Sequence, residues 1–158
     1  MTISVGDRLP DAELRTMTPD GPSVVKSSEV LGTGKVVLFA VPGAFTPGCS
    51  NVHLPGFVER AGELKAKGVT TIACVAVNDP FVMDAWGKAH GADDILLLSD
   101  GNGEFTAAMG LELDGSGFGL GKRSKRYAAI VEDGVLTSLD VDDKGIDLST
   151  CSNVLLKL

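Results

Sequence analysis

The sequence has few cysteines, few aromatic residues and fewer basic than acidic side chains. Its 158 residues include three cysteines, an aromatic fraction of 5%, and 14 basic against 21 acidic residues, for a formal charge of −7. Three cysteines cannot all pair within one chain, which argues against a disulfide scaffold and for a reducing compartment. The acidic balance repels phosphate backbones, so nucleic acid is not an expected partner.

Long apolar runs and targeting signals are also missing. No segment approaches the roughly 20 apolar residues that span a bilayer, so no membrane partner is expected. The stretch 1–14 lacks the basic start and apolar run of a secretory signal. We therefore expect a cytoplasmic protein, or one of an organelle matrix if a transit peptide is missing from this chain. The length predicts a single domain over residues 1–158.

Apolar, β-branched runs predict strands that are buried on both faces. These strands are expected at 35–41, 69–77 and 95–99. Later in the chain, two strand-like runs on either side of Glu132-Asp133-Gly134 predict a hairpin over 126–141.

Apolar positions at steps of three and four predict the helices. One is expected over 48–67, kinked at Pro55, and a second over 81–90. A short C-terminal helix is expected to begin after Ser149 or Thr150. The order β-α-β-α-β, then hairpin, then helix predicts an α/β protein with a thioredoxin-like fold: a mixed central β-sheet flanked by helices on both faces, with extra N-terminal strands.

The segment VPGAFTPGCS, residues 41–50, places Cys49 where a predicted strand turns into a helix. Its sulfur is expected to face backbone N–H groups and the positive end of the helix dipole, which favours a reactive thiolate. The alternative is a cysteine packed as a small hydrophobe. Thr46 stands where a Cys-x-x-Cys motif would have its first cysteine, so its hydroxyl is expected to bond the thiolate or a polar substrate, or to cap the helix.

Three motifs resemble the peroxiredoxins. Residues 42–49 match the Pro-x-x-x-Thr-x-x-Cys signature, and VPGAFTPGCS followed by HLPGF is similar to its form in the type II, or atypical two-cysteine, branch. The resemblance continues through CVAVNDPFVMDAW and GLGKRSKRYAAIVEDG and covers residues from about 5 to 157. It implies a thioredoxin-like fold and a thiol peroxidase that reduces hydrogen peroxide, alkyl hydroperoxides and often peroxynitrite, without metal, haem or flavin.

The resemblance also implies the catalytic residues. Cys49 falls at the peroxidatic cysteine, Thr46 and Arg126 at the residues that complete the site, and Pro42 at the proline that shields it. A guanidinium beside the sulfur favours the thiolate, and fixed donors stabilise the charge that develops on the leaving oxygen.

Other residues near Cys49 are expected to line the substrate pocket, namely Gly48, Phe45 and His53. His53 is one helical turn from Cys49, a spacing that would also suit a Cys-His hydrolase pair or two metal ligands. No third ligand at metal spacing accompanies them, so we expect no metal and assign His53 a structural or pocket-lining role. The segment 115–126 is expected to be a mobile loop that borders the Cys49 site.

An oxidised Cys49 would be a sulfenic acid that must meet a second thiol. Cys151 resembles the resolving cysteine of animal-type members, and Cys74 resembles the second cysteine of plant-type members. Cys74 lies in a predicted core strand, whereas Cys151 lies near a chain end that can move more cheaply. We therefore expect Cys151 to resolve, with Cys74 as the alternative.

Family resemblance implies thioredoxin or glutaredoxin with glutathione as the reductant, and a homodimer. Two alternatives stay open on the same fold: a thiol-disulfide oxidoreductase or thiol-dependent chaperone, and a non-enzymatic peroxide sensor. The missing Cys-x-x-Cys motif argues against the oxidoreductase. Recycling by a thiol reductant would distinguish an enzyme from a sensor.

Overall fold

The computed structural model describes residues 1–158 and is built around one seven-stranded sheet. The strands lie in the order β2-β1-β5-β4-β3-β8-β9. Their bounds are β1 Glu13–Thr18, β2 Gly21–Lys26, β3 Lys35–Ala40, β4 Thr71–Ala76, β5 Leu96–Ser99, β8 Arg126–Glu132 and β9 Val135–Asp142. Strands β3, β4 and β5 pair in parallel, and the remaining pairs are antiparallel. The predicted mixed sheet is therefore confirmed, as is the hairpin, which is formed by β8 and β9.

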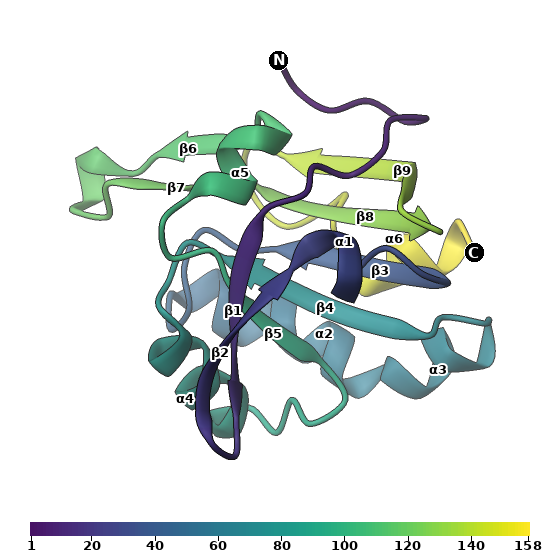
Figure 1. The fold of residues 1–158 in the computed structure, drawn as a ribbon, viewed down its shortest axis with the longest axis horizontal. Helices are drawn as coiled ribbons and strands as arrows, with labels where there is room; N and C mark the ends of the chain where they lie inside the picture. The colour runs from purple at the N-terminus through teal and green to yellow at the C-terminus, as the bar shows by residue number, and fades with distance from the viewer.

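Helices cover both faces of this sheet. They are α1 Ser27–Val30, α2 Leu54–Glu59, α3 Ala61–Ala66, α4 Pro80–Ala89, α5 Glu104–Met109 and α6 Cys151–Leu156, with a π-helix at Cys49–His53. Figure 1 shows α2 and α4 behind the sheet and α1 in front of it. No helix is long and apolar enough to cross a membrane.

Strand β3 shows why the central strands are almost purely apolar. Val37 and Phe39 pack in the core on the side of α2, α4 and α6, whereas Val36 and Leu38 pack in the core on the side of α1 and α5. Successive side chains of a strand point to opposite faces, so a strand between two helical layers needs apolar residues at every position. The thioredoxin-like arrangement follows from this two-sided burial.

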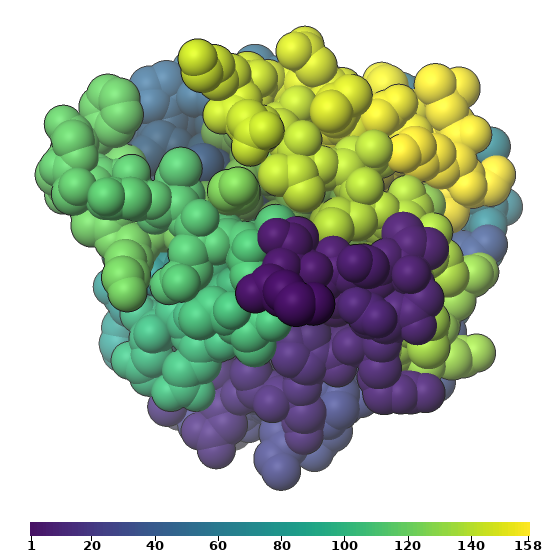
Figure 2. Space-filling model, turned by 90° about the horizontal axis from the view of Figure 1, so that it is seen from above, coloured from purple at the N-terminus to yellow at the C-terminus, as the bar shows by residue number.

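The N-terminal residues pack against α5 and the strand β9. Figure 2 shows this segment, in purple, against the green segment that contains α5. The Ile3 N–H donates to the Met109 carbonyl at 2.9 Å, and the Gly6 N–H donates to the Leu136 carbonyl at 2.8 Å. Gly110 permits this approach, because a Cβ there would lie 2.1 Å from the Met1 carbonyl oxygen.

The prediction of one helix over 48–67 is confirmed in part: residues 47–59 are continuously helical, with the π-helix running directly into α2, but the helix does not reach 67 unbroken. Pro55 lies inside this helical stretch, two residues after the π-helix ends at His53, and the chain is helical on both sides of it. The chain instead breaks at Arg60, whose φ and ψ are −110° and 15°. The Arg60 guanidinium there bonds Glu63 of α3 and Ser152 of α6, so this break joins three helices.

A second correction concerns 115–126, which was expected to be a mobile loop. Most of this stretch belongs to a two-stranded hairpin, formed by β6 Glu112–Asp114 and β7 Lys122–Ser124 with a 3-10 turn at Ser116–Phe118. Figure 1 shows the hairpin projecting from the edge of the molecule. Its glycines had suggested a loop, but Gly119 and Gly121 provide the left-handed turn residues that reverse the chain between the strands.

Candidate active site

The chain turns sharply after β3, and hydrogen bonds hold this turn in place. The Ala44 N–H donates to the Asn78 side-chain oxygen at 2.9 Å, and the Thr46 N–H donates to the Gly43 carbonyl at 3.3 Å. Phe45, at the tip, has a φ of +64°, which is uncommon for a residue with a side chain. The turn thus delivers Cys49 to the first position of the π-helix.

The sulfur of Cys49 is fully buried and faces a cation. Arg126, the first residue of β8, donates from Nη2 to the Cys49 Sγ at 3.1 Å. The position at a helix start had suggested backbone N–H groups as partners of this sulfur, and the family resemblance had implied Arg126; the structure shows the guanidinium as its hydrogen-bond donor. A charged donor this close stabilises the thiolate form, which is the nucleophilic form of cysteine.

His53 occupies the other side of the same guanidinium. Its Nε2 lies 2.9 Å from the Ser149 carbonyl oxygen, so Nε2 carries the proton and donates it. Its Nδ1 then has a free lone pair, which accepts from Arg126 Nη1 at 2.8 Å. Burial, and next the Arg126 charge, lower the pKa of His53 from 6.5 to about 4. A neutral imidazole therefore helps to orient the arginine that contacts Cys49.

A cavity of about 380 Å³ opens beside Arg126, although neither Cys49 nor Thr46 is among the residues that line it. It is lined by Pro42, Gly48, Leu113, Lys125, Arg126, Asp142, Asp143, Gly145 and Ile146. A Cβ on Gly48 would lie 3.2 Å from the Ile146 Cδ1 and 3.4 Å from Arg126 Nη2. A glycine at position 48 therefore allows the cavity wall and the guanidinium to approach closely.

Two of the predicted pocket residues sit elsewhere. Phe45 does not line this cavity, because its turn conformation leaves 54% of the residue exposed. His53 is buried and reaches the site only through Arg126. Thr46 lies at the start of the helical segment, but its hydroxyl donates to the Gly43 carbonyl at 2.7 Å and forms no helix cap. The lone pairs of that hydroxyl remain able to accept a hydrogen bond.

Sequence reasoning missed two residues that hold the site. Asn78 fixes the turn through Ala44, as described above, and it follows directly on the strand that the sequence predicts over 69–77, a place where side chains at the sheet edge often act. Arg123 of β7 donates from Nη1 to the Pro42 carbonyl at 3.3 Å. A Cβ on Gly43 would lie 2.8 Å from this Nη1, so the glycine makes room for the guanidinium.

All three cysteines are free, buried and part of one core cluster, on the α2 side of the sheet. Burial, and next the nearby Cys49, raise the pKa of the Cys74 thiol. Burial also raises the pKa of Cys151 from 9.0 to about 11, against the opposing charge of Arg60. Both thiols are therefore protonated at neutral pH, while Cys49 alone has a guanidinium on its sulfur.

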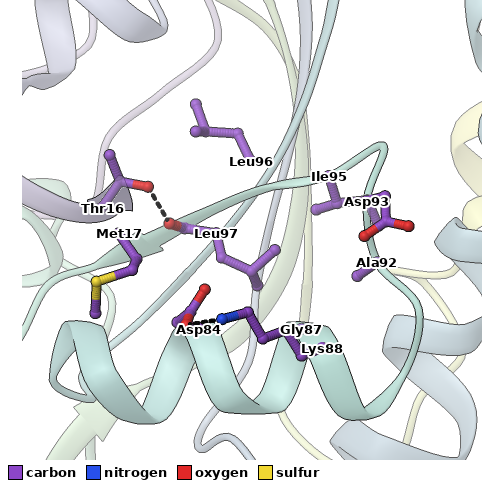
Figure 3. A pocket seen from close by; sticks show the side chains of 10 residues that line it. All are labelled: Thr16, Met17, Asp84, Gly87, Lys88, Ala92, Asp93, Ile95, Leu96 and Leu97. Atoms are coloured by element: carbon purple, nitrogen blue, oxygen red, sulfur yellow. Dashed lines mark hydrogen bonds and ion pairs between the residues drawn. The ribbon is translucent and has the colours of Figure 1, made fainter. Parts of the chain in front are cut away.

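A second cavity, of about 240 Å³, lies on another part of the surface between α4 and the strands β1 and β5. Figure 3 shows Asp84 and Lys88 of α4 paired with each other on its floor; their charged atoms are 2.9 Å apart. No cysteine or histidine lines this cavity. No group of three or more potential metal ligands gathers anywhere in the structure.

A thioredoxin-like fold with a buried thiol against a guanidinium defines a thiol-based redox protein. Residues 4–155 match the Redoxin family. The chain is 51% identical to Peroxiredoxin-2E, chloroplastic, of Arabidopsis thaliana, over 99% of this chain and 69% of the relative. It is 45% identical to Peroxiredoxin-2B of the same plant, over 99% and 98%. Reduced Prx3 of Vibrio vulnificus in complex with hydrogen peroxide superposes with a TM-score of 0.96 at 50% identity, over 99% of both chains.

The chain therefore belongs to the peroxiredoxins, and within them to the type II branch. It is a thiol-dependent peroxidase, an enzyme that consumes a peroxide and is restored by a thiol reductant. The family resemblance seen in the sequence, and the thioredoxin-like fold that it implied, are both confirmed.

The buried His53 should make the stability of the protein depend on pH. Its pKa of about 4 in the folded chain lies below 6.5, so between these values the unfolded chain binds more protons at this group. The free energy of unfolding should therefore fall as the pH drops from 6.5 to 4, by about 3 kcal/mol from this histidine.

Urea denaturation at both pH values, for the parent and His53→Gln, measures this loss as the difference between the two proteins. His90→Gln is the matched control, because the sequence contains only these two histidines. An identical loss in the parent and in His53→Gln would show that His53 does not titrate in this range.

Proposed function

We propose that Cys49 is the peroxidatic residue of this peroxidase, and that Thr46, Arg126 and Pro42 complete its site. The observation that carries this proposal is the hydrogen bond of 3.1 Å from Arg126 Nη2 to the Cys49 Sγ. It provides a stabilised thiolate beside the cavity that Pro42 and Gly48 line. The Thr46 hydroxyl, which gives its proton to Gly43, can accept a hydrogen bond from a peroxide.

In the proposed reaction the Cys49 thiolate attacks one peroxide oxygen. The S–O bond forms as the O–O bond breaks, and the second oxygen leaves with the electron pair, taking a proton to become water or an alcohol, or leaving as nitrite when the substrate is peroxynitrite. The sulfur is oxidised by two electrons to a sulfenic acid. The Arg126 guanidinium stabilises the negative charge on the leaving oxygen as well as the thiolate.

We propose small peroxides as the substrates: hydrogen peroxide, alkyl hydroperoxides and peroxynitrite. The cavity of about 380 Å³ has room for such molecules. The similar Prx3 of Vibrio vulnificus forms a complex with hydrogen peroxide in its reduced state. We propose no resident cofactor, since the proposed reaction needs only the thiol, the peroxide and a reductant.

For resolution of the sulfenic acid we propose Cys151, with Cys74 as the alternative. Cys151 is the first residue of the short terminal helix α6, whereas Cys74 belongs to the central strand β4, paired on both sides. Freeing α6 breaks fewer contacts than freeing β4. Two observations favour Cys74. Cys49 is near enough to raise the pKa of Cys74, and several similar relatives are plant proteins, the type whose second cysteine Cys74 resembles.

We propose thioredoxin, or glutaredoxin with glutathione, as the reductant, and a cytoplasmic or organelle-matrix location. Two relatives carry the word chloroplastic in their names. We also propose that residues 1–158 form a single domain, because the Redoxin match and the seven-stranded sheet both extend over nearly the whole chain.

A homodimer is proposed on the side of the active-site turn. Three phenylalanines lie largely in solvent on segments near this turn: Phe45 is 54% exposed, Phe81 of α4 is 64% exposed, and Phe118 of the hairpin is 89% exposed. Exposed aromatic side chains of this size are typical of protein interfaces. A second copy of the chain would bury them.

The first test concerns Arg126. Arg126→Gln removes the charge and should slow hydrogen peroxide reduction about a hundredfold or more, the effect of losing one donor to a developing anion. Peroxide consumption with excess dithiothreitol measures the rate. Lys122→Gln, which removes an exposed cation nearby, is the control and should keep the parent rate. Cys49→Ser should show no peroxide reduction. Turnover by Cys49→Ser would refute the assignment of the peroxidatic residue.

A second test identifies the resolving cysteine. After one equivalent of hydrogen peroxide, peptide mapping without reductant should find a Cys49–Cys151 disulfide in the parent and in Cys74→Ser. In Cys151→Ser the same treatment should leave Cys49 as a sulfenic acid without a disulfide, and a second equivalent of peroxide should oxidise it to the sulfinic acid, because no thiol intercepts it. A Cys49–Cys74 link in the parent would assign resolution to Cys74 instead.

A third test concerns assembly. Sedimentation velocity should find the parent as a dimer at micromolar concentration, and Phe81→Asp as a monomer, because a buried carboxylate opposes association. Val24→Asp is the control, since Val24 is 54% exposed on the edge strand β2, away from the turn. A parent that sediments as a monomer would contradict the proposed homodimer.

A further inference from the structure

Residues 143–150 form a strap that runs from the end of β9 to the start of α6. We propose that Asp142, the last residue of β9, is a positioning residue for peroxide reduction, which acts through Ser149 and His53 on the Arg126 guanidinium. This proposal rests on the assignment of Cys49 as the peroxidatic residue.

The carboxylate of Asp142 accepts several hydrogen bonds from the strap. The backbone N–H groups of Asp147, Leu148 and Ser149 donate to its two oxygens at 3.2, 3.0 and 2.9 Å, and the Ser149 hydroxyl donates at 2.6 Å. Asp142 is only 7% exposed. Because three consecutive N–H groups bond one buried carboxylate, the position of the Ser149 backbone is fixed.

That position decides which nitrogen of His53 carries the proton. The Ser149 carbonyl can only accept, so it holds the proton on Nε2 at 2.9 Å and leaves Nδ1 as an acceptor for Arg126. With the carbonyl displaced, the proton can move to Nδ1, where its N–H would face an N–H of the guanidinium. Two donors in contact repel, and Arg126 would lose its alignment toward the Cys49 sulfur.

The charged groups around His53 indicate that Asp142 acts on this histidine through position and not through its protonation state. They are Arg126 from β8, Asp142 from β9, and Arg60 at the end of α2, which lines a small cavity together with His53. The Asp142 charge favours a protonated imidazole, yet burial and Arg126 prevail and the ring is neutral at neutral pH. Removing the Asp142 charge would leave the ring neutral. Asp142 also stands opposite Arg126 in the pairing of β8 with β9 and lines the same cavity, so the tautomer of His53, and not the rate alone, distinguishes positioning through His53 from a direct effect of the charge.

Asp142 itself is ionised at neutral pH. Burial raises its pKa, but the hydrogen bonds from Ser149, Leu148 and Asp147 outweigh burial and bring the pKa below 3.8. An asparagine of the same shape has one acceptor oxygen in place of two, and its NH₂ group would face the strap N–H groups. Asp142→Asn is therefore a small change that releases the strap.

A matched control lies two residues earlier on the same strand. Asp140 also links β9 to the end of α6, through an ion pair with Lys157, and its side chain forms no hydrogen bond with the strap or with His53. Asp140→Asn thus removes a carboxylate with the same strand and helix as neighbours but leaves the Ser149 carbonyl in place.

The experiment measures two quantities for the full chain, with melting temperature as a check on folding. One is the rate of hydrogen peroxide reduction, and the other is the nitrogen NMR spectrum of the labelled imidazoles, which reports the tautomer of His53 with His90 as reference. We expect Asp142→Asn to react about tenfold more slowly, as for the loss of a charge-assisted hydrogen bond, and to lose the single Nε2–H signature. Asp140→Asn should match the parent in both quantities.

Each other outcome has a definite meaning. A parental rate in Asp142→Asn, or a slow rate with an unchanged His53 tautomer, overturns the proposal. If Asp142→Asn does not fold, Ser149→Ala removes the hydroxyl bond alone and must show a smaller loss of rate together with a mixed tautomer. Peroxide reduction by Cys49→Ser would instead overturn the proposed function, so the two failures are distinguishable.

Discussion

A guanidinium removed from bulk water needs acceptors for its N–H groups, and this requirement organises the active site. Arg126 finds two acceptors on the same helical segment, the Cys49 sulfur at 3.1 Å and the His53 Nδ1 at 2.8 Å. The two acceptors are four residues apart, so one turn of the π-helix presents both to one side chain. The Cys49 sulfur and the His53 ring nitrogen each provide the lone pair that this arginine requires.

The pairing of strands in the sheet brings Cys49 and Arg126 together. Strand β8 pairs with β3 in antiparallel register, with Tyr127 opposite Ala40, and Arg126 is the residue before Tyr127. The turn that follows Ala40 returns Cys49 to the same end of the sheet. Residues 77 positions apart in the chain thus meet because two neighbouring strands end together. In the core on the α2 side, Phe39 of β3 stacks on Phe57 of α2 at 4.0 Å between ring centres and lies 5.1 Å from the His53 ring of the π-helix, so both helical segments pack against β3.

Much of this could be predicted from the sequence, since its central strands are apolar at every position and its active-site motif is specific. The strands around 35–41 and 69–77 could be predicted because burial on two faces requires a run of consecutive apolar residues. The break at Arg60 was missed, because it depends on Glu63 and on Ser152 of a distant helix. The role of Asp142 was also invisible, since a carboxylate in a polar stretch is usually solvated, and its donors are known only once the strap is folded.

The three unpaired cysteines share one packed core cluster with Phe57 and Trp86. A disulfide formed by Cys49 with either of the other two must be made inside that cluster, and the geometry of a disulfide differs from the contacts of packed thiols. The reduced protein is the packed form, and a turnover that passed through such a disulfide would disturb the packing of its own core. Peroxide would then unfold part of the protein locally, and the thiol reductant would restore it.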